Sequence, residues 1–258
     1  MNKRLIFITN DDGYQARGLA ALIEMMRPYG DIVAVAPKDA QSGMSGALTV
    51  KTPVRLRKIK EEPGLSIYAC SGTPADCVKL AMNHVFTRKP DLLVSGINHG
   101  ANTAISVIYS GTLAAAAEGT LYEIPSIGFS LDDHSPAADF TACVLYGRMI
   151  IDRALQAPFD KNTFLNVNFP DLPCNEIKGF KLCRQNRGAW VDEFEKRTDP
   201  HGFDYYWMTG VFQNHEEEAE DADENVINAG YVAIVPHHLD MTNYRELERL
   251  KEIWRFEE

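Results

Sequence analysis

Two adjacent acidic residues, Asp11 and Asp12, are the strongest candidates for chemistry in this sequence. They follow the apolar run at residues 5–8, which is typical of a buried strand, and they precede Gly13. Neighbouring carboxylates repel each other unless a cation or a proton neutralises them. One carboxylate could instead cap the next helix while the other faces water. The position at a strand end favours a divalent metal ion held by both.

Polar and glycine-rich segments follow three further apolar runs and would supply the rest of such a site. These segments are residues 37–46, 71–74 and 95–102. Because ligands of open parallel sheets bind beyond the carboxyl ends of the strands, we expect these segments near the two aspartates. Asn98 and Ser42 would add neutral oxygen ligands, which hard divalent ions accept. An Asx-turn at Asn98 and an ordinary turn at Ser42 remain the alternative interpretations.

A third group of residues has the chemistry to bind an anion. Ser110, Gly111 and Thr112 open a predicted helix, and the free backbone amides of a first helical turn attract phosphate. The glycines that follow Ser42 would likewise let backbone amides approach an anion. Ordinary capping by Ser110 explains the same residues equally well.

The elements that must position these residues alternate along the chain. Buried strands are expected at residues 4–9, 32–36, 54–56, 67–70, 92–95, 126–129, 164–168 and 231–235. Apolar residues recur at helical spacing over residues 19–26 and 78–85. This alternation predicts an α/β fold, with a mostly parallel, Rossmann-like sheet between two layers of helices in a three-layer α/β/α arrangement.

The character of the chain changes at Gly188, where aromatic and charged residues mix between turn signals. This pattern indicates a hairpin arm, followed by a last core strand and a charged terminal helix that starts at Tyr244. The acidic run at residues 216–224 is expected to be a solvated loop. We therefore divide the chain into an α/β catalytic core, 1–187, and a C-terminal part, 188–258, which is expected to serve oligomerisation.

Composition narrows the class of protein. The 258 residues are 45% hydrophobic and 24% charged, as in an ordinary globular protein. The formal net charge of -10 argues against a nucleic acid partner. The apolar runs are too short for a signal peptide or for the ~20 residues of a membrane-spanning helix. Five cysteines without CxxC spacing suit a reducing compartment, so a cytoplasmic protein is expected.

Several well-known catalytic motifs are absent from the chain. The sequence contains no GxxxxGK(S/T), GxGxxG, HExxH or GxSxG. A P-loop NTPase, a dinucleotide-dependent dehydrogenase, a zincin and a serine hydrolase with a nucleophile elbow therefore lose support.

Five motifs, taken together and in order, resemble the SurE family of survival-protein nucleotidases. They are ITNDDG at 8–13, SGMSGALT at 42–49, CSGTPADCV at 70–78, SGINHGAN at 95–102 and YSGTLAAAAEG at 109–119. The similarity continues through NVNFP at 166–170 and GYVAIVPHHLDMT at 230–242. The chain departs from the family's pattern at two places. After Ser42 it reads GMSGALT, where many relatives have a different string of small and polar residues. Before the last strand it has Ala222-Asp223, where relatives often have Thr-Asp.

The resemblance implies a metal-dependent phosphatase that cleaves nucleoside 5′- and 3′-monophosphates and, in some members, short polyphosphate. It assigns one divalent ion per subunit, Mg²⁺ or Mn²⁺, to Asp11, Asp12, Ser42 and Asn98. It places substrate binding at Asn10, Gly43, Ser71, Gly72, Thr73, Asn102, Ser110, Gly111 and Thr112. It also implies a homodimer or homotetramer in which the C-terminal arms are exchanged.

The mechanism implied by this resemblance has Asp11 as the main ligand of the metal ion and Asp12 as the group that orients the attacking water. An aspartyl-phosphate intermediate remains the alternative. A polyphosphate or sugar-phosphate phosphatase, and a sensor that binds a phosphorylated ligand without turnover, are competing hypotheses.

Overall fold

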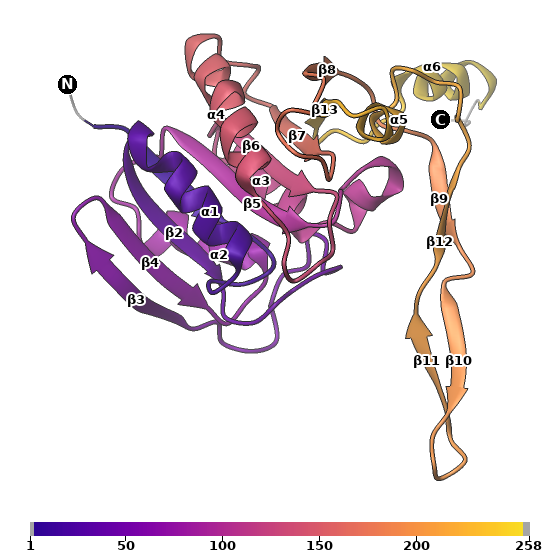
Figure 1. The fold of residues 1–258 in the computed structure, drawn as a ribbon, viewed down its shortest axis with the longest axis horizontal. Helices are drawn as coiled ribbons and strands as arrows, with labels where there is room; N and C mark the ends of the chain where they lie inside the picture. Colours follow the sequence, from indigo (N-terminus) through magenta and orange to yellow (C-terminus); the bar gives the residue numbers. More distant parts are fainter. Residues whose placement is uncertain (1–2, 255–258) are drawn as a thin grey trace.

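A nine-stranded sheet forms the centre of the computed structural model, which describes residues 3–254 (Figure 1). The strands run in the order β3-β4-β2-β1-β5-β6-β7-β13-β8. Their bounds are β1 Leu5–Thr9, β2 Asp31–Pro37, β3 Leu56–Glu62, β4 Leu65–Cys70, β5 Leu92–His99, β6 Ser126–Leu131, β7 Thr163–Phe169, β8 Phe180–Leu182 and β13 Val232–His238. From β4 to β7 all neighbours are parallel, while β3 and β13 run antiparallel to β4 and β7.

Helices cover both faces of the sheet. Helices α1 (Arg17–Met26) and α4 (Thr141–Gln156) pack on one face, and α2 (Pro74–His84) and α3 (Gly111–Leu121) on the other. Within β1, Ile6 and Ile8 join the first core cluster and Phe7 the second, because successive strand side chains point to opposite faces. The three-layer α/β/α fold with a mostly parallel sheet is confirmed.

Glycine residues line the contact between helix α3 and the sheet. A Cβ atom at Gly119 would lie 2.4 Å from Ser126 Oγ, and one at Gly128 in β6 would lie 2.6 Å from Leu113 Cδ2. The 3-10 segment η2 (Ala104–Ile108) leads into α3, and a second one, η1 (Arg27–Tyr29), follows α1. Glycine at these positions lets α3 settle directly onto β5 and β6.

One strand boundary was predicted wrongly. A strand was expected at residues 54–56, but β3 only starts at Leu56 and continues to Glu62. This edge strand reads LRKIKEE and is largely exposed, so it lacks the apolar run by which buried strands are recognised.

The hairpin arm is confirmed and projects away from the layered core (Figure 1). It consists of two antiparallel ladders in succession, β9 (Gly188–Val191) with β12 (Val211–Asn214), then β10 (Phe194–Thr198) with β11 (Asp204–Met208). Most of its large apolar side chains are exposed. The terminal helix α6 (Tyr244–Ile253) is also present, and none of its residues is buried.

The expectation of a solvated loop at residues 216–224 is wrong for Asp223. This residue begins the short helix α5 (Asp223–Asn228) and is fully buried. Its carboxylate accepts hydrogen bonds from the backbone amides of Ala104, Asn186 and Glu224. A run of acidic residues does not reveal which side chain is buried. Here Asp223 is buried because backbone amides of two other segments donate hydrogen bonds to its carboxylate.

Two observations bear on the compositional expectations. All five cysteines are free, and Cys70, Cys77 and Cys143 are buried. Between residues 3 and 254 no helix combines the length and apolarity needed to cross a membrane.

Candidate functional site

Asp11 is buried where β1 ends, with 3% of its surface exposed. Its Oδ1 accepts a hydrogen bond from the Thr112 hydroxyl in the first turn of α3. A Cβ atom at Gly111 would lie 2.8 Å from the Asp11 Cβ and 3.0 Å from its Oδ2. Residue 111 is therefore glycine for a steric reason, because the amino end of α3 rests directly on the Asp11 side chain.

Burial makes both neighbouring carboxylates difficult to ionise without a cation. Loss of solvent raises the pKa of Asp11 to about 6, the Thr112 hydrogen bond opposes this rise, and the charge of Asp12 adds to it. Burial also raises the pKa of Asp12, while His99 lowers it through its charge and its backbone amide. Among the described residues no hydrogen-bond donor reaches Asp12 Oδ2, although this atom is buried. An unpartnered buried carboxylate oxygen beside a second carboxylate fits a hard cation.

A tight turn presents the two carboxylates. The Asn10 side chain donates to the Gly13 carbonyl (3.0 Å) and accepts from the Gly13 amide (3.2 Å), and Gly13 has a φ of 102°. Asn10 is thus engaged in shaping the turn. Its direct contact with a substrate, which the sequence predicted, stays a prediction.

The loop that carries Ser42 lies against Asp11. The Gln41 amide donates to the Asp11 carbonyl at 2.8 Å, which places Ser42 next to the aspartate pair. Further along, Ser45 donates through its amide to the Tyr109 carbonyl and through its hydroxyl to the Ile108 carbonyl. Ser42 and Gly43 are exposed on this loop. The loop therefore spans the space between Asp11 and the entrance to α3.

Asn98 lies at the end of β5, the strand beside β1. Its side-chain nitrogen donates to the carbonyls of His99 (3.2 Å) and Gly100 (2.9 Å). Because these bonds use the amide hydrogens, the Oδ1 atom is the one that could bind a cation. The neighbouring residue, His99, is the one that acts on Asp12.

The segment of Ser71, Gly72 and Thr73 builds the amino end of α2. Thr73 and Asp76 form a capping box, and the Thr73 hydroxyl donates to the Ala47 carbonyl at 2.7 Å. Ser71 Oγ accepts from the Arg55 amide, and Gly72 packs against Asp76. The contacts of these three residues are with α2 and its neighbouring loops. Their role in substrate binding stays a prediction.

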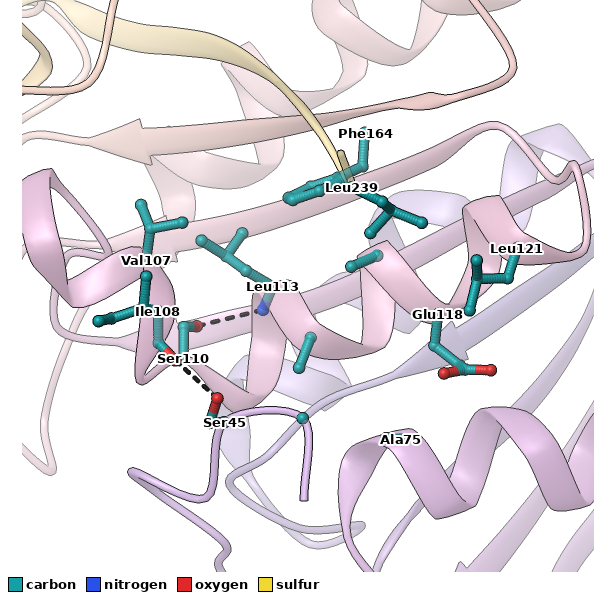
Figure 2. Close-up of a pocket in the computed structure, with 13 residues that line it drawn as sticks. Ser45, Ala75, Val107, Ile108, Ser110, Leu113, Glu118, Leu121, Phe164 and Leu239 are labelled. Atoms are coloured by element: carbon teal, nitrogen blue, oxygen red, sulfur yellow. Dashed lines mark hydrogen bonds between the residues drawn. The ribbon is translucent and has the colours of Figure 1, made fainter. Parts of the chain in front are cut away.

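Ser110 caps α3 and borders a hollow of about 240 Å³. Its Oγ accepts from the Leu113 amide at 3.1 Å. Figure 2 shows the hollow extending from Ser45 and Ser110 along the outer side of α3 towards Leu121. Its lining is mostly apolar, with Val107, Ile108, Leu113, Phe164 and Leu239 among the residues that form it.

Asn102 points inward, and its side-chain nitrogen donates to Ser130 Oγ at 2.8 Å. Sequence reasoning missed the residues that surround it, Asn166 and Asn168 of β7, both of which are fully buried. The signal was present, because asparagine alternates with apolar residues in a strand predicted to be buried.

The donor set at the aspartate pair is rich in oxygen. In the described part of the chain, no three His, Cys, Asp or Glu residues gather in a group that could hold a metal ion. The candidate site combines two carboxylates with an amide and a hydroxyl instead. The fold and this site define an open-sheet α/β protein with a candidate cation site where parallel strands end, beside a helix amino terminus.

Comparison with known proteins identifies the family. The family model described as survival protein SurE matches residues 6–192. The 5′-nucleotidase SurE of Phocaeicola vulgatus is 45% identical over 255 residues, which cover 99% of this chain and 98% of that protein. The 5′-nucleotidase SurE of Bacteroides thetaiotaomicron is 48% identical over 250 residues, covering 96% and 95%. The crystal structure of the SurE protein from Aquifex aeolicus matches with a TM-score of 0.83 at 36% identity, covering 96% of this chain and 99% of that one. The chain belongs to the SurE family.

Proposed function

We propose that this protein hydrolyses nucleoside 5′-monophosphates, and 3′-monophosphates as well, to a nucleoside and phosphate with the help of one divalent cation, Mg²⁺ or Mn²⁺. The relatives named 5′-nucleotidase, which match over nearly the whole chain, support the activity. The observation that carries the proposal is the buried carboxylate of Asp11 beside the half-buried Asp12, whose Oδ2 atom is buried and has no partner among the described residues.

The cation is proposed to be held by Asp11, Asp12, Ser42 and Asn98. When bound, it supplies Lewis acidity and positive charge, which polarise a phosphoryl oxygen and a water molecule. Thr112 orients the Asp11 carboxylate through its hydroxyl, and Asp12 would orient the attacking water. The positive end of the α3 dipole would favour negative charge on the phosphoryl oxygens.

The remaining substrate-binding assignments follow the same geometry. Gly111 and Thr112 lie directly against Asp11, Ser110 precedes them as the cap of α3, and Gly43 follows Ser42 on the adjacent loop. The hollow along α3 begins at Ser110, so the nucleoside end of the substrate would lie there (Figure 2). Its apolar lining suits a flat base better than a second phosphate.

A substrate panel tests the activity. AMP, GMP, 3′-AMP, polyphosphate and 4-nitrophenyl phosphate would be compared with Mn²⁺ and with a chelator. We expect turnover of the nucleoside monophosphates that requires the cation and falls at least ~100-fold in Asp11→Asn, because a well-placed electrostatic group typically contributes that much. Near-normal activity of a folded Asp11→Asn variant would refute the site.

The same panel separates the competing functions. Preference for polyphosphate or a sugar phosphate would replace the nucleotidase proposal with another phosphatase. Binding of AMP without turnover of any ester would favour a sensor.

We also propose that the chain forms a homodimer or homotetramer by exchanging its C-terminal arm. Helix α6 buries none of its residues on its own chain, and the arm exposes aromatic side chains at its tip. The division into a core, 1–187, and an assembly part, 188–258, belongs to this proposal. Light scattering after size exclusion measures the subunit number.

The free thiols suit the reducing conditions of the cytoplasm, where we propose the protein acts.

A further inference from the structure

The base of the hairpin arm is hydrogen-bonded to the 3-10 segment η2. Trp190 in β9 donates through its Nε1 atom to Ser106 Oγ at 3.2 Å. Gln185, which lies just before β9, donates through its Nε2 atom to the Ala104 carbonyl at 2.7 Å. Ala104 has a φ of 48°, a left-handed conformation that is unfavourable for a residue with a Cβ atom and must be held by its surroundings. The bond from Gln185 is one of the contacts that hold it.

A buried carboxylate joins the same two segments. Asp223 accepts from the Ala104 amide through its two oxygens, at 3.3 and 3.2 Å, and its Oδ1 atom also accepts from the Asn186 amide at 2.9 Å. Thr103, which precedes η2, donates through its hydroxyl to Glu224 of α5 at 2.6 Å. Because Asp223 is fully buried, its bonds cannot be replaced by bonds to water without exposing it. The base of the arm, η2 and α5 therefore form one connected unit.

The position of η2 depends on these external bonds. The segment is five residues long, and Ala104 is the one residue in it that is buried. Short 3-10 helices have poor internal hydrogen-bond geometry, and a segment with little buried surface is held weakly by packing. Loss of a bond from the base of the arm should therefore loosen η2 while the core stays folded.

The other side of η2 forms a wall of the hollow. Val107 and Ile108 line it, and Figure 2 shows both at the end where Ser45 and Ser110 lie. Ser45 holds η2 on this side, since its hydroxyl donates to the Ile108 carbonyl at 2.6 Å. Ser110 caps α3, whose first turn contacts Asp11, so this end of the hollow is the one next to the aspartate pair.

We propose that the base of the arm positions η2 and thereby sets the shape of the hollow in which the nucleoside end of the substrate binds. The inference rests on the proposed function, which places the nucleoside in that hollow. Gln185 and Trp190 are positioning residues that act through η2, since neither of them lines the hollow. The arm then has a second role besides assembly, because a movement of its base moves one wall of the nucleoside site.

The test removes each bond with a side chain of similar shape. Gln185→Met removes the donor to η2, and its matched control is Gln213→Met, an exposed residue of β12 in the ladder with β9. Trp190→Phe removes the Nε1 donor and keeps an aromatic ring at that position. Its matched control is Trp207→Phe in β11, an exposed residue further along the arm.

Three measurements are made on each full-length protein with Mn²⁺ present, at a concentration where light scattering gives the same mass for all. They are KM and kcat for AMP, the inhibition constant Ki of inorganic phosphate, and amide exchange of the peptide over residues 104–109.

We expect KM for AMP to rise roughly fivefold in Gln185→Met and ~3-fold in the more exposed Trp190→Phe, since loss of one hydrogen bond changes an equilibrium by about such a factor. The Ki of phosphate and kcat should change less than ~2-fold, because phosphate has no group that reaches the hollow. Exchange over residues 104–109 should accelerate in both variants, and both controls should behave as the wild type.

The other outcomes decide against the inference or against the proposed function separately. Faster exchange over residues 104–109 with an unchanged KM for AMP would overturn the positioning role, as would unchanged exchange or an equal rise of KM in the controls. A matching rise in the Ki of phosphate would show that the bonds act on the phosphate end of the site and would overturn the role of the hollow.

The wild type decides the proposed function. If it binds AMP but hydrolyses no ester, the proposed function is refuted, and the Kd of AMP replaces KM in judging the arm. If it neither binds nor hydrolyses AMP, the proposed function and the inference are both overturned.

Discussion

Replacing Asp11 with asparagine should make the metal-free protein more stable at neutral pH. The folded-state pKa of Asp11 is about 6, against 3.8 for an ordinary aspartate, and the first cause is burial. Because the folded pKa lies above the unfolded one, the folded chain holds the proton more tightly. The stability from this group is fully present below 3.8 and is lost as the pH rises through about 6.

The magnitude follows from the size of the shift. A rise of roughly two pKa units, at ~1.4 kcal/mol each, destabilises the folded metal-free protein by up to ~3 kcal/mol at neutral pH. The asparagine side chain of the variant is neutral at all pH values and keeps an oxygen for the Thr112 hydroxyl. After allowing for burial of the new amide, we expect Asp11→Asn to be more stable by ~1–3 kcal/mol.

Urea unfolding in the presence of a chelator measures this difference. The gap should be present at neutral pH and close at about pH 4, where the wild-type carboxyl is protonated in the fold. Asp223, whose pKa burial also raises to about 6, contributes equally to both proteins and cancels. Added Mn²⁺ should reverse the order, because a ligand at ~1,000 times its Kd stabilises the wild type by about 4.1 kcal/mol, which exceeds this difference. A variant that is less stable than the wild type in chelator at neutral pH would refute the reasoning.

Three further predictions concern the surroundings of Asp11 and the arm. Thr112→Val removes a hydrogen bond that lowers the pKa of Asp11, so the acid limb of Mn²⁺ binding should move up by roughly half to one pH unit, while Thr112→Ser should leave it in place; an unchanged limb in Thr112→Val would contradict the role of that bond. Gly111→Ala should weaken Mn²⁺ binding by ~10-fold or more in calorimetry because the new methyl group meets Asp11. Gly46→Ala is the control, since nothing lies within 4 Å of its added methyl group, and equal losses in the two variants would count against the steric argument. The double change Phe194→Ser and Met208→Ser, at paired and exposed positions of the arm, should lower the mass measured by light scattering with little change in the melting temperature at low concentration; an unaltered mass would exclude this part of the arm from the interface.

The sheet was predictable where side chains are uniformly apolar. The run in β1 marks a strand covered on both faces, and the structure places Ile6, Phe7 and Ile8 in two separate cores. The start of β3 was misplaced because an exposed edge strand carries charged residues that resemble a loop. Local pattern thus identifies buried strands well and edge strands poorly.

The approximate location of the site was predictable, while its internal contacts were not. The rule that ligands lie beyond the carboxyl ends of parallel strands brings Asp11, the loop of Ser42 and the amino end of α3 together. The bonds of Asn10 to Gly13 and of Ser71 to Arg55 depend on how loops fold back, which no spacing in the sequence specifies. The buried state of Asp223 likewise depends on amides that lie 119 and 37 residues away in the chain.

The close packing of α3 on the sheet couples positions far along the helix to Asp11, which lies at its amino end. Gly119 is eight residues from Gly111, roughly 12 Å along the helix axis, yet a methyl group there would collide with Ser126 and Leu93. If α3 moves as a rigid body to relieve that collision, Thr112 at its amino end moves away from Asp11. A substitution at Gly119 would therefore change the pKa of Asp11 without touching the aspartate. Small side chains on this face of α3 are then required for the site as well as for packing.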